Sequence, residues 1–288
     1  MTFQGSGPLD TGNVSGGGGG GGGRIALGGG VGLIVTVVAL LFGINPGDIM
    51  GGGTGSTDST SASASAIDQH VASCTIEKAN QGDAVCRIVA TTNSLDQVWP
   101  SLMNGYTPPK TVIFSGSVNT GCGAATSATG PFYCPADKTA YFDPDFFETL
   151  VQMGGSNGPL AQEYVVAHEY GHHVQNLTGA LRKGQQLGSQ GPRSGSVRVE
   201  LQADCLAGVW ANHAGGAGYD VRLQQLTPQD IAGVIQTAKA IGDDTIQGAG
   251  SNPEGWTHGS AQQRARWFST GYQGGDPKRC DTFATNDL

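Results

Sequence analysis

The chain has few charged residues, and its basic residues form no cluster. Asp, Glu, Lys and Arg together make up 13% of the 288 residues, and the formal net charge is −8 at pH 7. A protein that binds nucleic acid needs a basic face to neutralise phosphates, so the composition argues against a nucleic-acid partner. The length allows one or two domains.

No two cysteines have the Cys-x-x-Cys spacing, which argues against a zinc site made of cysteines. The six cysteines are an even number, and in a domain outside the cytoplasm disulfides are the natural interpretation. Free buried thiols are the alternative. Sequence alone allows fifteen pairings of six cysteines. The pairing we favour joins near neighbours and leaves one distant pair: Cys74–Cys86, Cys122–Cys134 and Cys205–Cys280.

The first quarter of the chain lacks the pattern of a folded core. Residues 1–24 are polar and rich in glycine, with an unbroken run over 16–23, and we predict a disordered tail. Residues 25–44 carry no charge over about twenty positions, long enough to cross a bilayer, and predict a transmembrane helix. Residues 45–66 are rich in Gly, Ser, Thr and Ala and predict a flexible linker. The globular domain is then expected over 67–288.

The charges beside the 25–44 segment predict its orientation. Arg24 precedes it, and the next basic side chain is Lys78, so the N-terminal side is expected inside and the domain outside the cytoplasm. The predicted location is therefore the cell membrane, with a single crossing. A cleaved signal peptide is the main alternative, but the segment lies late and no small-x-small site follows it. A buried core helix is the other.

The globular region predicts an α+β fold that is mainly helical, with a small sheet. Residues 111–114 and 139–142 are β-branched or aromatic and predict strands. Helices are expected over 159–177, 197–210 and 228–241, and again over 261–272, from apolar spacing and from Pro and Gly at their ends.

The helix over 159–177 contains His-Glu-Tyr-Gly-His at positions 168–172. Residues four apart lie on one helical face, so His168 and His172 can ligate one ion, and two imidazoles suit Zn²⁺. Glu169 beside them can take a proton from a water on the metal. The alternative is a surface helix that carries two histidines by chance. A third ligand must come from elsewhere, because Gln175 and Thr178 replace the Gly and His of the longer metzincin motif.

The next helix offers that third ligand. Glu200 and Asp204 are also four residues apart, beside an apolar face. We predict Glu200 as the ligand and Asp204 as the acceptor of a hydrogen bond from a ligand histidine. The alternative is a solvated acidic face.

These motifs resemble a known family. His168 and His172 followed by E-L-Q-A-D at 200–204 are similar to the gluzincin pattern. The chain most resembles the bacterial putative neutral zinc metallopeptidase family. The resemblance covers about 122–280, outside the tail and linker, and is carried by GCGAA, GPFYCPAD, TAYFDPDFF, VAHEYGHHVQ, VELQADCLAGVWA, IGDDTIQ and HGSAQQRARWF.

The resemblance implies a zincin-like fold and one Zn²⁺ per chain, with a peptide or protein as substrate. Glu169 is then the general base. His258 is a candidate donor to the oxyanion, by similarity to gluzincins that use a later His or Tyr; a capping or structural histidine is the equal alternative. Two other functions are weighed against a peptidase: a binding or scaffold module with a structural metal site, and an interaction domain without a metal.

Overall fold

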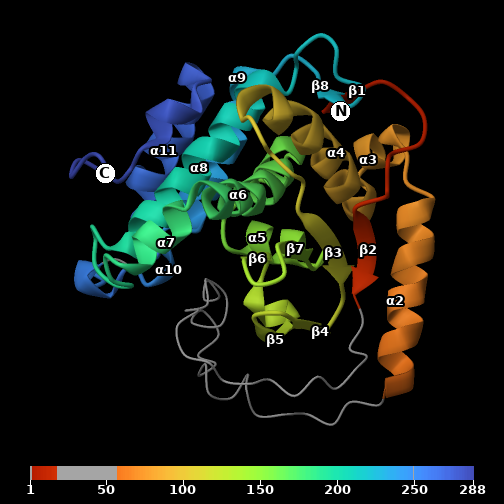
Figure 1. Cartoon of the computed structure of the whole chain (residues 1–288), viewed down its shortest axis with the longest axis horizontal. Helices are drawn as coiled ribbons and strands as arrows, with labels where there is room; N and C mark the ends of the chain where they lie inside the picture. Colours follow the sequence, from red (N-terminus) through yellow and green to blue (C-terminus); the bar gives the residue numbers. More distant parts are fainter. Residues whose placement is uncertain (1, 18–56, 249) are drawn as a thin grey trace.

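One long helix occupies the centre of the structure, a computed structural model that describes residues 2–17, 57–248 and 250–288. This helix, α6 (Pro159–Thr178), lies between a small sheet and a layer of helices formed by α8 (Gly195–His213) and α11 (Ala261–Gly274) (Figure 1). The predicted fold class, mainly helical with a small sheet, is confirmed for the described residues.

Local sequence signals set the ends of these three helices. Pro159 stands in the first turn of α6, where a missing N–H costs nothing, and Gly179 ends the helix in the left-handed conformation. Ser194 caps α8 by accepting a hydrogen bond from the Val197 N–H, and Ser260 caps α11 in a capping box with Gln263. Stable ends fix the rotation of each helix and therefore the direction of its polar side chains.

A glycine inside the motif lets α6 and α8 approach each other closely. A Cβ atom built on Gly171 would lie 3.1 Å from both Cα and O of Ala203 on α8. Such a contact is tighter than ordinary packing, so a larger residue would push the helices apart. The spacing between the predicted ligand pairs of α6 and α8 therefore depends on this glycine.

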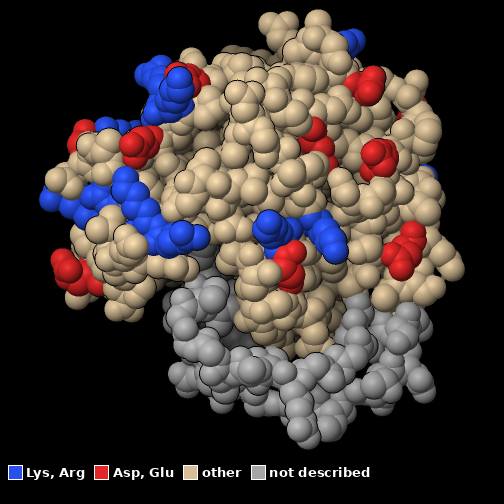
Figure 2. Space-filling view, in the orientation of Figure 1, with Lys and Arg blue, Asp and Glu red and all other residues tan. Residues whose placement is uncertain are grey.

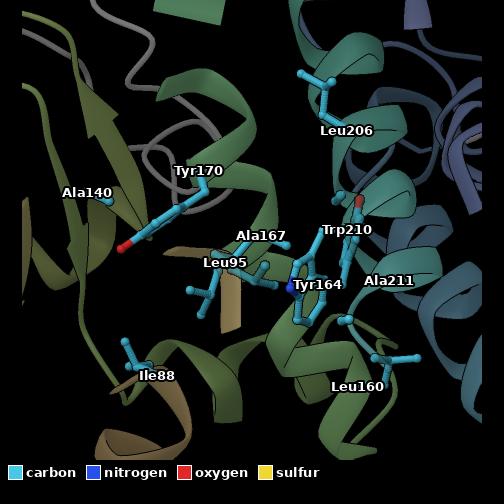
Figure 3. Packing of buried hydrophobic residues seen from close by; sticks show 14 of the residues in the cluster. Ile88, Leu95, Ala140, Leu160, Tyr164, Ala167, Tyr170, Leu206, Trp210 and Ala211 are labelled. Carbon is cyan, nitrogen blue, oxygen red and sulfur yellow. The ribbon is translucent and has the colours of Figure 1, made fainter. Parts of the chain in front are cut away.

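The other side of α6 packs on the sheet. Its strand order is β2 (Val14–Gly17), β3 (Lys110–Phe114), β7 (Thr139–Phe142), β6 (Phe132–Cys134), with β6 antiparallel to β7 and the other neighbours parallel. Tyr170 points from α6 to the sheet, where its hydroxyl lies 3.0 Å from Thr111 Oγ1, whereas Tyr164 lies on the side of α6 that faces α8 (Figure 3). The motif helix is thus fixed from both sides.

The remaining elements surround this core. They are β1 (Phe3–Gln4), α2 (Thr57–Ala72), α3 (Ile76–Gln81), α4 (Ala84–Leu102), β4 (Ser117–Thr120), β5 (Gly123–Thr126), α5 (Phe146–Gln152), α7 (Ala180–Gln185), β8 (Arg222–Leu223), α9 (Pro228–Ala240), α10 (Asp243–Ile246) and the short 3₁₀ turns η1 (Ser127–Thr129), η2 (Pro253–Gly255) and η3 (Pro277–Cys280).

All six cysteines form disulfides, and the predicted pairing is confirmed. Two bridges close short stretches, each with a sequence separation of 12, and the third joins α8 to η3 across a separation of 75. The bonded pairs are Cys74–Cys86, Cys122–Cys134 and Cys205–Cys280.

The prediction of a disordered tail over 1–24 is wrong for residues 2–17, which belong to the folded body. Phe3 is buried in the core, β1 pairs with β8, and β2 is a strand of the central sheet. Asn80 accepts from the Phe3 N–H and donates to the Phe3 carbonyl, and Asn93 makes the same pair of bonds with Asp10. Side chains of α3 and α4 thus bind the segment as a strand would.

The predicted single-pass membrane location is contradicted. In the described ranges, no helix is both long and apolar enough to span a bilayer, and residues 25–44 lie outside those ranges. Residues 2–17 and the chain from 57 onward pack into one body, whereas a single crossing would separate them. The domain boundary at 67 is also wrong, because residues 57–66 lie in α2; the rest of the predicted linker, 45–56, is outside the described residues.

Candidate metal centre and active site

Two imidazoles from α6 and one carboxylate from α8 converge at the centre of the fold. His168 Nε2 lies 3.1 Å from Glu200 Oε2, and His172 Nε2 lies 3.5 Å from Glu200 Oε1. The imidazole rings are nearly perpendicular, with centroids 4.7 Å apart. All three side chains are buried.

These atoms fit a zinc ion. Ligand atoms around tetrahedral zinc, at bond lengths of about 2.0–2.2 Å, lie about 3.3–3.6 Å from each other. The two observed distances lie close to that range, and the set of two imidazoles and one carboxylate is one that zinc enzymes use. Three protein ligands leave a fourth position for water or substrate.

Asp204 supports His168 through a buried network of charged groups. Its Oδ1 lies 2.9 Å from His168 Nδ1 and accepts from the Tyr164 hydroxyl at 2.5 Å. Arg264 of α11 donates from Nε to Asp204 Oδ2 and from a terminal nitrogen to Oδ1, both at 2.9 Å. Burial would raise the pKa of Asp204, but Arg264 and His168 hold it below its ordinary value. The carboxylate therefore stays charged and keeps its bond to His168 Nδ1.

His172 has a neutral support instead. Its Nδ1 lies 2.8 Å from Oε1 of Gln175, one turn later on α6. Both ligand histidines thus have one ring nitrogen bonded to the protein and the other, Nε2, directed at Glu200.

The electrostatic environment differs for the two histidines. Burial would lower the pKa of His168, but the carboxylates of Asp204 and Glu200 outweigh it and raise the pKa to about 10. For His172 burial prevails and lowers the pKa to about 4, although Glu200 acts in the other direction. Burial also disfavours the charge of Glu200, but His172 and His168 hold its pKa well below the usual range.

Glu169 lies beside the candidate metal ligands, and its neighbours offset only part of the effect of burial on its charge. Ligand atoms of His168, Glu169 and His172 all lie within 4.8 Å of one another. Burial raises the pKa of Glu169 to about 7, opposed by His168 and by a main-chain hydrogen bond from Tyr133 of β6. A carboxylate with a pKa near 7 can both accept and return a proton close to neutral pH.

His258 is buried in the loop before α11. A Cβ atom built on the next residue, Gly259, would lie 3.2 Å from Leu201 Cδ2, so this loop packs against α8 next to the residue that follows Glu200. Its Nδ1 lies 2.8 Å from Thr257 Oγ1 and 3.3 Å from Asp243 Oδ1, so Nε2 is the nitrogen left for a substrate. Ser260, not His258, caps α11, so the capping alternative is wrong. Five of the six predicted site residues thus lie in one cluster, and His258 lies in a loop against the helix that carries Glu200 and Asp204.

Other histidines lie away from the cluster. His173 bonds to the Tyr133 hydroxyl and the Thr107 carbonyl. His70 pairs with Asp83 in an exposed position, and His213 contacts the Gly275 carbonyl.

Four supporting residues had no sequence signal strong enough to find them. Arg264 and Tyr164 are far in sequence from Asp204, and Gln175 was considered only as the position where a metzincin has glycine. Asp243 lies at the start of α10, and its carboxylate accepts from the N–H groups of the turn 257–259 and contacts the His258 ring. A buried side chain whose partner is fixed only by tertiary packing gives no local pattern.

Two bacterial proteins are similar to this chain over most of its length. Uncharacterized protein Rv2575 of Mycobacterium tuberculosis is 58% identical over 214 residues, which cover 70% of this chain and 72% of that protein. Uncharacterized protein YpfJ of Escherichia coli K12 is 39% identical over 283 residues, which cover 95% of this chain and 94% of that protein. No solved structure matches.

The matching family model carries the description "Putative neutral zinc metallopeptidase" and covers residues 4–283. The match includes the N-terminal segment, which the motifs alone had left outside the resemblance. On the length of this match, and on the relatives above, the chain belongs to the putative neutral zinc metallopeptidase family.

Proposed function

We propose that this chain is a zinc-dependent peptidase in which His168, His172 and Glu200 hold the metal and Glu169 is the general base. The observation that carries the proposal is the convergence of both Nε2 atoms on Glu200 while both Nδ1 atoms are bonded to other side chains. This arrangement directs both Nε2 atoms at one place where a metal would bind, and zinc on binding would displace the proton that Glu200 stabilises on His168. Family membership supports the coarser statement, a zinc metallopeptidase.

The protein groups divide the chemistry among them. Zinc, when bound, would lower the pKa of a water to about 7 and polarise the substrate carbonyl. Glu169 accepts a proton from the attacking water and delivers it to the leaving amine. In its imidazolium form, with Nδ1–H directed at Asp243, His258 donates from Nε2 to the carbonyl oxygen as negative charge develops on it. Asp243 and Thr257 keep the His258 ring in place for this role.

The sheet offers a place for an extended peptide. β6 is an edge strand that pairs only with β7 in the described sheet. The main chain of Tyr133 in β6 acts to lower the pKa of Glu169, so this strand lies on the side of α6 that carries the general base. An extended peptide paired with that edge would have its main chain close to Glu169.

Elemental analysis of the full chain tests the metal site. We expect about one zinc per chain, and loss of that zinc in His172→Ala. The matched control is His70→Ala, which removes an exposed histidine away from the site and should keep the zinc. A wild-type chain that stays free of zinc after purification with excess metal would overturn the site.

A second variant separates binding from chemistry. Glu169→Gln keeps the shape of the side chain but cannot accept a proton. We expect zinc content to stay at the wild-type level and cleavage of a peptide library to fall by about 10²–10⁴-fold. Undiminished cleavage by Glu169→Gln would show that Glu169 is not the general base.

A further inference from the structure

A chain of side-chain amides connects His172 to the surface turn η3. Gln175 Nε2 donates to the Val199 carbonyl at 2.7 Å and to Gln202 Oε1 at 3.1 Å. Gln202 Nε2 in turn donates to the Cys280 carbonyl at 2.8 Å. Gln175 is completely buried and Gln202 is partly buried. These hydrogen-bonded amides thus connect α6, α8 and η3.

The direction of these bonds determines the protonation of His172. An amide group has two N–H donors, and both N–H groups of Gln175 are directed at carbonyl oxygens. Only Oε1 of Gln175 is left to face His172, and an oxygen without a hydrogen must accept. His172 Nδ1 therefore carries the hydrogen, and Nε2 has its lone pair free.

A disulfide fixes the outer end of this series of hydrogen bonds. Cys280, whose carbonyl accepts from Gln202, is bonded to Cys205, three residues after Gln202 on α8. The disulfide keeps η3 against α8, so the acceptor stays where Gln202 needs it. Without that acceptor, the Gln202 amide could rotate by 180° and direct its N–H groups at Gln175. The series of hydrogen bonds from Cys280 to His172 would then lose its fixed direction.

We infer that Gln175 and Gln202 are positioning residues that fix His172 in the tautomer with a bare Nε2 directed at Glu200. This inference deepens the proposed function and rests on it where it concerns zinc. The tautomer itself can be observed without metal, so the two can fail separately.

The tautomer is measured by ¹⁵N NMR on histidine-labelled, metal-free full-length protein at pH 8. We expect the wild type to show Nδ1–H for His172, assigned by loss of its signals in His172→Asn. Gln175→Met keeps the length of the side chain but removes the acceptor, and we expect both tautomers to be populated. Gln175→Glu restores an acceptor and should restore Nδ1–H.

Zinc affinity, measured by chelator competition, gives the second readout. We expect Gln175→Met to weaken zinc binding by about 10–100-fold, the effect of removing a support of a ligand histidine. For Gln202→Met, the loss of one hydrogen bond predicts a weakening of about 2–10-fold. Gln185→Met, on the exposed side of α7, is the matched control and should change nothing. Thermal unfolding of each variant verifies that it folds.

Each outcome decides one point. An unchanged tautomer and unchanged zinc affinity in Gln175→Met would overturn the inference. An effect of Gln175→Met without any effect of Gln202→Met would overturn the part that extends to η3. A wild type that shows Nδ1–H at His172 but binds no zinc would overturn the proposed function and leave the positioning role intact.

Discussion

Glu163 of α6 and Asp204 of α8 are equally buried carboxylates, and their pKa values shift in opposite directions. Asp204 and Glu163 both have no exposed surface. Asp204 has four polar contacts of 2.9 Å or less, from His168, Tyr164 and two nitrogens of Arg264. Among the described side chains, the nearest cationic atom to the Glu163 carboxylate is Arg87 Nε, at 4.0 Å. The pKa of Asp204 lies below its ordinary value, whereas burial raises that of Glu163 to about 7.

The comparison shows that donors, rather than depth, decide the charge of a buried acid. Burial alone raises the pKa of any carboxyl, and only hydrogen bonds or cations at short distance reverse it. Arg87 donates from its two terminal nitrogens to Gln162 Oε1 and to the Ala79 carbonyl, so neither of these nitrogens is directed at Glu163. The fully paired acid is the one that supports a metal ligand. On the face shown in Figure 2, acidic and basic side chains are scattered among uncharged residues.

Asp204→Asn should lower the unfolding free energy and the zinc affinity more than any other variant proposed for these two acids. The variant removes the negative charge but leaves Arg264 buried, and breaking such a pair costs about 3–5 kcal/mol of unfolding free energy. Urea unfolding of the metal-free protein measures the loss. Zinc affinity should also fall by about 10–100-fold, because His168 loses its charged support.

The control for Asp204→Asn is an exposed ion pair whose arginine, Arg266, also lies on α11. Arg266 and Asp287 lie 2.8 Å apart in solvent, where such pairs contribute little. Asp287→Asn should therefore leave the unfolding curve and zinc affinity unchanged. Equal losses in the two variants would mean that burial of the pair has no role.

Glu163 should make stability fall as pH rises. The folded pKa of about 7 lies above the ordinary value of 4.5, so the folded state binds the proton more tightly than the unfolded state. Stability from this group is complete below about pH 4.5 and is lost as pH rises through 7, by about 3 kcal/mol in total. Urea unfolding between pH 5 and pH 8 measures it.

Glu163→Gln isolates that contribution. Glu169 and Asp96 also have pKa values raised to about 7, so the wild-type slope contains all three groups. Glu163→Gln should flatten the pH dependence by its own share only. An unchanged slope in Glu163→Gln would mean that Arg87 pairs with Glu163 more strongly than the 4.0 Å separation indicates.

The motif helices, the candidate ligands and the disulfides could be predicted because their signals are local. Histidines four apart on one helix, and acids four apart on the next, define a face without any knowledge of the fold. The disulfides followed from sequence proximity, with only Cys205–Cys280 left over. By contrast, Arg264 and Tyr164 meet Asp204 from 60 and 40 residues away, and no period or motif indicates such a meeting.

The prediction for the N-terminal segment was wrong because glycine is common both in disordered segments and in closely packed strands. A glycine run is typical of disorder, yet Gly16 and Gly17 lie in β2 where neighbours leave no room for a side chain. A Cβ on Gly16 would collide with the Ala64 carbonyl of α2, and one on Gly17 would lie 2.5 Å from Val112 Cγ1. Here glycine permits close packing of the strand. Composition cannot distinguish that role from flexibility.

Tyr164→Phe should have the smallest effect, and it tells which donor keeps Asp204 charged. The variant removes one hydrogen bond to Oδ1 and leaves both bonds from Arg264 in place. We expect a loss of about 1 kcal/mol in urea unfolding and a change in zinc affinity below about fivefold. A loss as large as that of Asp204→Asn would mean that the hydroxyl, and not the guanidinium, is the main support of the carboxylate. Because Arg264 satisfies both oxygens and carries the opposite charge, its two bonds should suffice to keep His168 in place.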